Sequence, residues 1–162
     1  MNLLSGESSN SFFGGEVPPA VSRLLDQIHG APARETEALL WTAQATAPDC
    51  LAVYYLLYKF HAGRREFELA ERAACSGLAV AARQAGLAED WRDVPAGSVD
   101  FSRPGPARFW LFTLKALAFI KLRQGEVALA NALIGKIEAL HPNGGLGDDV
   151  VAALLAGLGP RR

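Results

Sequence analysis

Residues 111–144, LFTLKALAFIKLRQGEVALANALIGKIEALHPNG, decide the fold. The part before Gly125 is apolar on nearly every side, and a glycine there can end a helix because it adopts left-handed backbone angles without strain. The part after Gly125 carries one apolar stripe with helical spacing, formed by Ala130, Leu133, Ile134, Ile137 and Leu140. Pro142 cannot continue a helix. The stretch therefore predicts two antiparallel helices joined by a tight turn.

Small and large side chains occupy particular positions along this helix pair. Ala118 and Ala130 would let two helices cross closely, while Ile134 would fill the seam between them. Together with the closing Pro142, these positions resemble the pattern of a tetratricopeptide repeat. The resemblance implies a short solenoid of stacked helical hairpins, in which the first helix of each hairpin lines a concave groove.

The preceding region follows this pattern less closely. Residues 51–63, LAVYYLLYKFHAG, are apolar nearly all round, which predicts a central helix that ends at Gly63. Residues 65–86, REFELAERAACSGLAVAARQAG, predict a long alanine-rich partner helix with Ala70 at the small position. The dipeptide Leu57–Tyr58 departs from the leucine and glycine that the tetratricopeptide pattern usually has there.

The remaining segments add shorter helices. Two are expected between Val17 and Ala47, and Asp148 can cap a last one. No segment shows the alternation that is typical of a strand. The expected fold is therefore all-α, with about seven helices in antiparallel hairpins that form a short solenoid or a bundle.

A single helical domain is expected over residues 17–158, after a flexible arm at residues 1–16 that is rich in Ser, Gly and Asn. The connection at residues 87–105 is unusually long for a helical domain. It carries the apolar side chains of Trp91, Val94, Val99 and Phe101, so it is not a plain solvated linker. We therefore expect an ordered excursion that is either functional or a cover for an exposed edge of the core.

Composition excludes several classes of protein. The chain has 162 residues, of which 50% are hydrophobic and 20% charged, with a formal net charge of −1. It is too apolar to be disordered throughout, and it has no basic excess to attract nucleic acid. The longest apolar run, Leu51–Tyr58, is far shorter than the ~20 residues of a membrane helix. Because the N-terminus lacks an export signal, we expect a cytoplasmic protein.

Catalytic and metal-binding motifs are absent from the sequence. There is no GxSxG, no phosphate-binding loop and no glycine-rich dinucleotide motif, so we expect neither an enzyme nor a cofactor. Cys50 and Cys75 are expected to be buried small apolar residues. Two alternatives stay open: a metal- or cofactor-handling site in which these cysteines meet His61, and an enzyme whose site is assembled only in three dimensions.

When the sequence is aligned with the tetratricopeptide pattern, the positions that line the groove carry aromatic and basic side chains. The resemblance therefore implies a protein-binding surface of these side chains. Its candidate residues are Tyr55, Lys59, Arg108, Phe112, Lys115, Phe119 and Arg123. Such a surface suits an extended or acidic segment of another protein. In the alternative interpretation, Phe112 and Phe119 belong to the core and Lys115 extends along it to the surface. The apolar last helix could also cap the stack or pair with a second copy of the chain.

A second resemblance concerns three strings: LAVYYLLYKF at residues 51–60, DW at 90–91 and RFWLFTLKALAFIKLRQGE at 108–126. They are similar to small tetratricopeptide-type proteins encoded among bacterial nitrogen-fixation genes. The resemblance implies an accessory role near nitrogenase or the assembly of its cofactor. The function expected from the sequence is therefore a non-enzymatic adaptor.

Overall fold

The protein is all-helical in the part that the computed structural model describes, residues 16–142, where no strand occurs. The six α-helices are α2 (Pro19–Asp26), α3 (Ala33–Thr46), α4 (Leu51–Gly63), α5 (Phe67–Ala85), α6 (Pro106–Arg123) and α7 (Val127–Leu140). A 3-10 turn, η1 (Trp91–Asp93), lies between α5 and α6. This confirms the all-α prediction, with six helices in place of about seven. The expected last helix and the dimer contact through it, like the arm before Glu16, lie outside the described residues.

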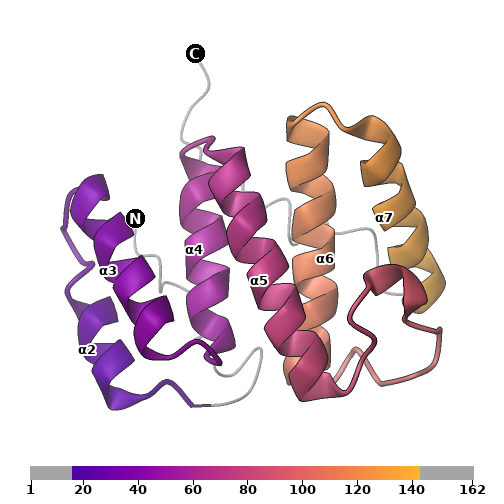
Figure 1. Ribbon diagram of the computed structural model, residues 1–162, viewed down its shortest axis with the longest axis horizontal. Helices are drawn as coiled ribbons and strands as arrows, with labels where there is room; N and C mark the ends of the chain where they lie inside the picture. Colours follow the sequence, from indigo (N-terminus) through magenta and orange to yellow (C-terminus); the bar gives the residue numbers. More distant parts are fainter. Residues whose placement is uncertain (1–15, 143–162) are drawn as a thin grey trace.

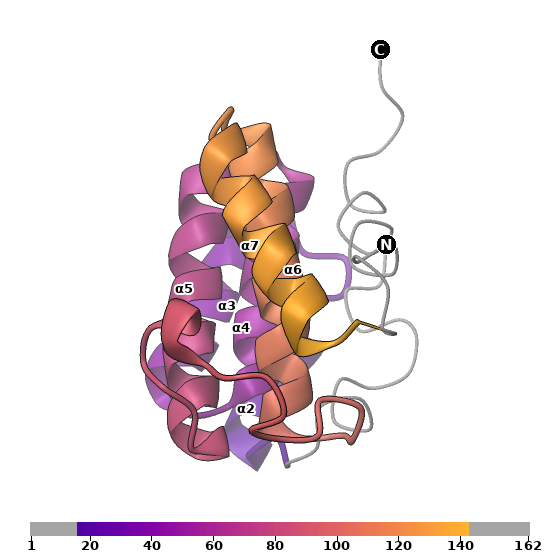
Figure 2. The ribbon, with the colours of Figure 1, turned by 90° about the vertical axis from the view of Figure 1, so that its right-hand side faces the viewer.

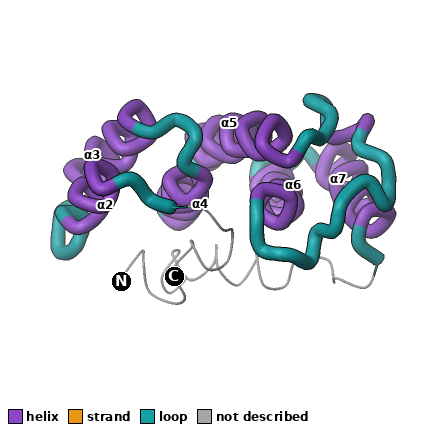
Figure 3. Tube along the Cα trace, turned by 90° about the horizontal axis from the view of Figure 1, so that it is seen from below, coloured by secondary structure: helices purple, strands orange, loops and turns teal. Residues whose placement is uncertain are grey.

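The helices stand side by side in chain order as three hairpins, α2–α3, α4–α5 and α6–α7 (Figure 1). Each helix packs on the next one in the sequence, and α4 also contacts α6. Seen along the helices, α5 lies to one side of the neighbouring pair α4 and α6 (Figure 3). Such an arrangement is consistent with a short helical solenoid.

Helices α4 and α6 form the centre of the fold. Both were expected to be covered on several sides because they are apolar nearly all round, and the structure confirms this. Buried residues occupy almost every turn of each helix. Tyr58 of α4 and Thr113 of α6 share a hydrogen bond of 3.2 Å that is fully inside the protein. This bond satisfies two hydroxyl groups that would otherwise be buried without partners.

A glycine on α5 permits the closest approach between helices. A Cβ atom added at Gly77 would lie 2.9 Å from the Cβ of Tyr54 in α4 and 3.2 Å from the Cζ of Phe109 in α6. The first distance is shorter than side chains tolerate, and a Cβ cannot move away without its backbone. Gly77 therefore sets the depth at which α5 packs between α4 and α6.

The turns of the second and third hairpins share one backbone geometry, offset by 60 residues in the sequence. Glu66 N–H donates to the carbonyl of His61 over 2.9 Å, and Glu126 N–H donates to that of Lys121 over 2.9 Å. Both glutamates also precede the first residue of the following helix. The same motif also ends α5, where Leu87 N–H donates to the carbonyl of Ala82 over 2.9 Å and Gly86 has φ 70°. It is therefore a general way of ending a helix in this fold.

The prediction that the central helix ends at Gly63 is confirmed, since Gly63 is the last residue of α4. The left-handed residue of the following turn is Arg65, with φ 61°. In the third hairpin the equivalent residue is Gly125, with φ 82°. In both turns the left-handed residue therefore lies directly before the glutamate.

Residues 87–105 are ordered and lie against α6 and α7 (Figure 2). Val94 and Phe101 are buried, and Phe101 stacks on Trp110 of α6 with 5.8 Å between ring centroids. Lys136 of α7 donates a hydrogen bond of 3.0 Å to the carbonyl of Arg92. These contacts show that the segment covers an edge of the core.

Replacing Gly77 by alanine should destabilise the protein by roughly 1–3 kcal/mol, because the new methyl group meets Tyr54 and forces α5 outward. The control is Gly135→Ala on α7, where nothing lies within 4 Å of the added Cβ. That change should raise stability by about 0.5–1 kcal/mol, since alanine favours helix. Urea unfolding measures both, and equal effects of the two substitutions would contradict the packing argument.

The two hairpin turns should respond to substitution in opposite directions. Arg65→Gly should raise the free energy of unfolding by about 0.5–1 kcal/mol, because glycine adopts the left-handed backbone conformation without the steric strain of a side chain. Gly125→Ala should lower the free energy of unfolding by about 1 kcal/mol, because it introduces that strain. Arg64→Gly is the control, because Arg64 has φ −96° and an ion pair with Glu66, so glycine should not stabilise there. A destabilised Arg65→Gly variant would refute the interpretation of the turn.

A candidate protein-binding face on helices α4 and α6

All seven predicted binding residues lie on the central helices α4 and α6, and we call the five that lie away from the ends of α6 the α4–α6 face. They are Tyr55, Lys59, Phe112, Lys115 and Phe119. The ring of Tyr55 meets the ring of Phe112 edge to face, with 5.8 Å between centroids. Lys59 places its Nζ 5.6 Å from the centroid of Tyr55. The structure thus brings three of the five into direct contact across the two helices, and helical spacing puts Lys115 and Phe119 on the same side of α6.

The two lysines of this face are covered over most of their surface. Lys59 and Lys115 are each only 9% exposed. Among the residues that the structure describes, no carboxylate lies within ion-pair distance of either ammonium group. A long lysine side chain can be covered along its stem and still bring its ammonium group to water.

The pKa values on α4 reflect this burial. Desolvation lowers the pKa of Lys59 below the ordinary range of a lysine. Desolvation also raises the pKa of the Tyr55 hydroxyl. Both shifts mean that the face disfavours charge in the free protein, so an anion that approached Lys59 would stabilise its protonated form.

Phe112 and Phe119 were expected to line a binding surface or, alternatively, to belong to the core, and the structure has features of both. Phe112 is 8% exposed and belongs to the hydrophobic core, while Phe119 is half-buried against it. Lys115 is itself buried, so its side chain gives little area to the protein surface. The face therefore consists of core side chains at its centre, with the lysines set among them.

Arg108 and Arg123 lie at the two ends of α6. Arg108 is half-buried in the first turn. Arg123 lies in the last turn, with its guanidinium 5.4 Å from the ring centroid of Phe67 on α5. Arg123 follows Phe112 in α6 by eleven residues, which places it about 16 Å farther along the helix axis at 1.5 Å per residue. The predicted set of seven residues is thus divided along α6.

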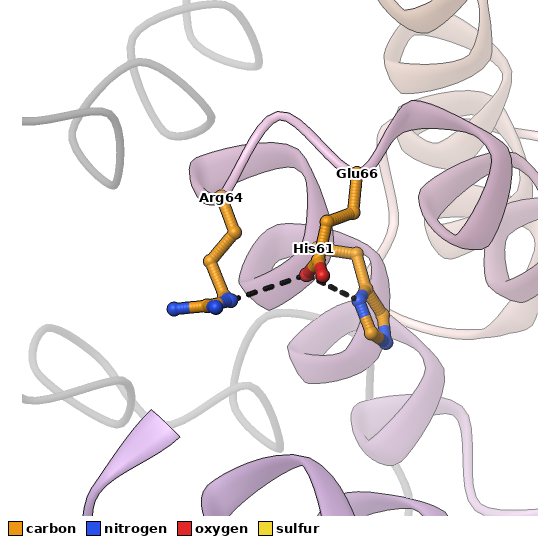
Figure 4. A network of polar contacts seen from close by, with 3 residues as sticks. All are labelled: His61, Arg64 and Glu66. Atoms are coloured by element: carbon orange, nitrogen blue, oxygen red, sulfur yellow. Dashed lines mark hydrogen bonds and ion pairs between the residues drawn. The ribbon is translucent and has the colours of Figure 1, made fainter. Parts of the chain in front are cut away.

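A polar network that local sequence patterns did not reveal closes the turns of the second and third hairpins. In the second hairpin the buried His61 approaches the Oε1 of Glu66 through Nδ1, at 3.1 Å, and Arg64 donates to the same oxygen over 3.2 Å (Figure 4). The other ring nitrogen of His61, Nε2, is buried and has no hydrogen-bond partner among residues 16–142. The ring of His61 lies 5.9 Å from that of Trp41 on α3.

In the third hairpin Lys121 takes the place of His61. Its Nζ lies 2.8 Å from both Glu71 and Glu126. Burial opposes the charge, but the two glutamates raise the pKa of Lys121 above that of an ordinary lysine. A basic residue five positions before a glutamate occurs in both turns, and this spacing was the sequence signal for the network.

An open depression of about 830 Å³ lies between the start of α5 and the α6–α7 turn. Its lining includes Glu66, Glu68, Glu71 and Glu126. Three of these glutamates already pair with basic side chains. The depression therefore offers little unpaired negative charge beyond Glu68.

The alternative metal site would need Cys50, Cys75 and His61 to meet. Cys50 precedes α4, Cys75 is exposed on α5, and His61 is buried beside Trp41. No group of three or more potential metal ligands occurs within residues 16–142. Over the same residues, no helix has the length and apolar character needed to cross a membrane.

Comparison with known proteins gives one informative similarity. The chain resembles an uncharacterised 19.8 kDa protein of Azotobacter chroococcum mcd 1 that is encoded in the region 5′ of nifW. The two sequences are 28% identical over 159 residues, which are 96% of this chain and 89% of the relative. No family model and no solved structure matches the chain.

The surroundings of Lys59 and Lys115 predict little cost on substitution. Lys59→Met should raise the free energy of unfolding slightly and Lys115→Met should leave it within about 0.5 kcal/mol, because methionine keeps the apolar volume and neither lysine forms an ion pair within residues 16–142. For Lys59 the folded-state pKa is depressed, so the penalty applies while the folded lysine is protonated and fades as pH rises through that pKa. The gain from Lys59→Met should accordingly shrink in alkaline solution.

Lys121→Met is the matched control for these variants. Lys121 is 8% exposed, as deeply buried as the other two lysines, but it bonds to Glu71 and Glu126. Its substitution should lower stability, because two carboxylates lose their partner. Thermal unfolding of the three variants compares them directly. A loss of stability in all three would mean that Lys59 and Lys115 have structural partners.

Proposed function

We propose that the protein is a non-enzymatic, cytoplasmic accessory protein of tetratricopeptide-like type, which binds another protein and is associated with nitrogen fixation. The association with nitrogen fixation is supported by the similarity, over nearly the whole chain, to a protein encoded beside nifW. The absence of catalytic motifs from the sequence supports a binding role over an enzymatic one.

The observation that carries the binding role is the side-by-side packing of successive hairpins. Two hairpins with the same turn geometry place their first helices, α4 and α6, next to each other. Repeated hairpins of this kind form extended surfaces that side chains from several repeats share. The α4–α6 face is such a surface, since Tyr55 and Phe112 meet across it from different hairpins.

A bacterium that carries the gene provides the test. Deleting the gene should slow growth on dinitrogen and lower acetylene reduction, while growth on ammonium stays unchanged. A tagged chain expressed at its native level should retain a protein encoded among the nitrogen-fixation genes, and only in cells that fix nitrogen. Normal growth of the deletion strain on dinitrogen, together with the same retained proteins in both media, would contradict the proposal.

A further inference from the structure

The α4–α6 face is covered, although no described helix lies over it. Helix α5 packs on the other side of α4 and α6, where Gly77 meets Tyr54 and Phe109. Seen along the helices, α3 and α7 flank the central pair, and none of the helices that the structure describes lies on the side away from α5 (Figure 3). Helix packing alone would therefore leave this face open to solvent.

Residues of the face are nevertheless buried. Lys59 lies about 140° around α4 from Tyr54, which meets α5, at about 100° per residue. Lys115 lies about 120° around α6 from Phe109, which also meets α5. Both lysines thus point away from α5, yet each residue is only 9% exposed over its whole surface. A part of the chain other than the described helices therefore covers the face.

The excursion at residues 87–105 does not explain the cover over α4. Its contacts join it to α6, where Phe101 stacks on Trp110, and to α7 through Lys136. Lys59 lies on the other central helix. The two ends of the chain, which lie outside the described residues, are thus the candidates for the cover.

From this contrast we infer that residues 1–15 cover the α4–α6 face, with Phe12 and Phe13 packed against Tyr55 and Phe112. The inference goes beyond the proposed function and stands without it, because it concerns a contact within one chain. It names the N-terminal segment, rather than the C-terminal one or a second copy of the chain, as the occupant of the face.

The place where the described chain begins favours the N-terminal segment. The stretch before α2, indigo in Figure 1, runs from α2 toward α4, and it approaches α4 from the side away from α5 (Figure 3). Val17 in this stretch packs against the hydrophobic core. Phe13 precedes Val17 by four residues, so an extended chain would carry it up to about 13 Å farther. Such a short tether gives the segment a high effective concentration at the face.

Aromatic complementarity separates the two ends of the chain. The α4–α6 face carries three aromatic rings, and Arg108 lies on the same side of α6. Aromatic rings pack edge to face on one another and attract a guanidinium to their faces. Phe12 and Phe13 are the only aromatic residues of the sequence outside residues 16–142. The N-terminal segment therefore matches the face better than the aliphatic segment at the other end.

Photo-cross-linking of the full chain tests the inference. Phe119, a half-buried residue of the face, is replaced by p-benzoylphenylalanine, and the irradiated protein is digested with trypsin. Cross-links are expected between α6 and the tryptic peptide of residues 1–23, which contains both rings. The control places the same probe at Arg72, an exposed residue of α5, where this cross-link should be absent.

Substitutions in the segment assign the cross-link to its rings. Phe12→Ser/Phe13→Ser should lower the cross-link yield roughly tenfold or more, because two large apolar contacts are lost. Ser8→Ala/Ser9→Ala is the matched control in the same segment and should keep the yield within about twofold. Circular dichroism of each variant ensures that a lost cross-link is not lost folding.

Other results would overturn the inference. A main cross-link to the tryptic peptide of residues 137–161 would assign the cover to the C-terminal segment. Cross-links between isotopically labelled and unlabelled chains, mixed before irradiation, would assign it to a second copy. Cross-links confined to residues 24–136, or a yield that the phenylalanine substitutions do not change, would show that residues 1–15 do not cover this face.

The proposed function can fail separately, because the cross-link forms in the purified chain without a partner. If the cross-link to residues 1–23 forms but deletion of the gene leaves nitrogen fixation unchanged, the cover stands and the proposed function falls. If the deletion strain is impaired but no such cross-link forms, the proposed function stands and the cover falls.

Discussion

The close approach of α5 to the two central helices is the constraint on which the remaining structure depends. Because Gly77 has no side chain, α5 settles onto Tyr54 and Phe109 and thereby holds α4 beside α6. The hydrogen bond between Tyr58 and Thr113 forms across that contact. The same contact brings together the rings and lysines of the α4–α6 face. The packing of Gly77 on one side of α4 and α6 therefore positions the side chains on the other side.

Much of the fold was predictable from the sequence, because hydrophobic periodicity and helix-breaking residues are local signals. The expected helix at residues 51–63 matches α4, and Pro106 begins α6. The left-handed conformation of Arg65 could not be predicted, because arginine gives no local sign of it. Pairing through Lys121 and His61 was missed because it depends on a turn geometry that appears only when the two hairpins are compared.

The candidate site was predictable in part. Helical spacing and the repeat register place Tyr55, Lys59 and Phe112 together, and the structure shows their contact. Spacing cannot show that Arg123 would turn toward Phe67 instead, since that contact comes from a different helix. The burial of Lys115 was equally hidden, because burial depends on what packs over a residue and not on its position along one helix.

The chain-order packing of the helices has a consequence for folding. Nearly every contact joins helices that are neighbours in the sequence, and α4 with α6 is the exception among the stronger ones. Such local topology allows rapid folding that begins at one hairpin and spreads to the next. Among the described helices, the stronger contacts join the pair α2 and α3 to the rest through α4, so this pair should open more readily than the centre. Amide exchange should therefore be graded along the chain, slowest in α4 to α6.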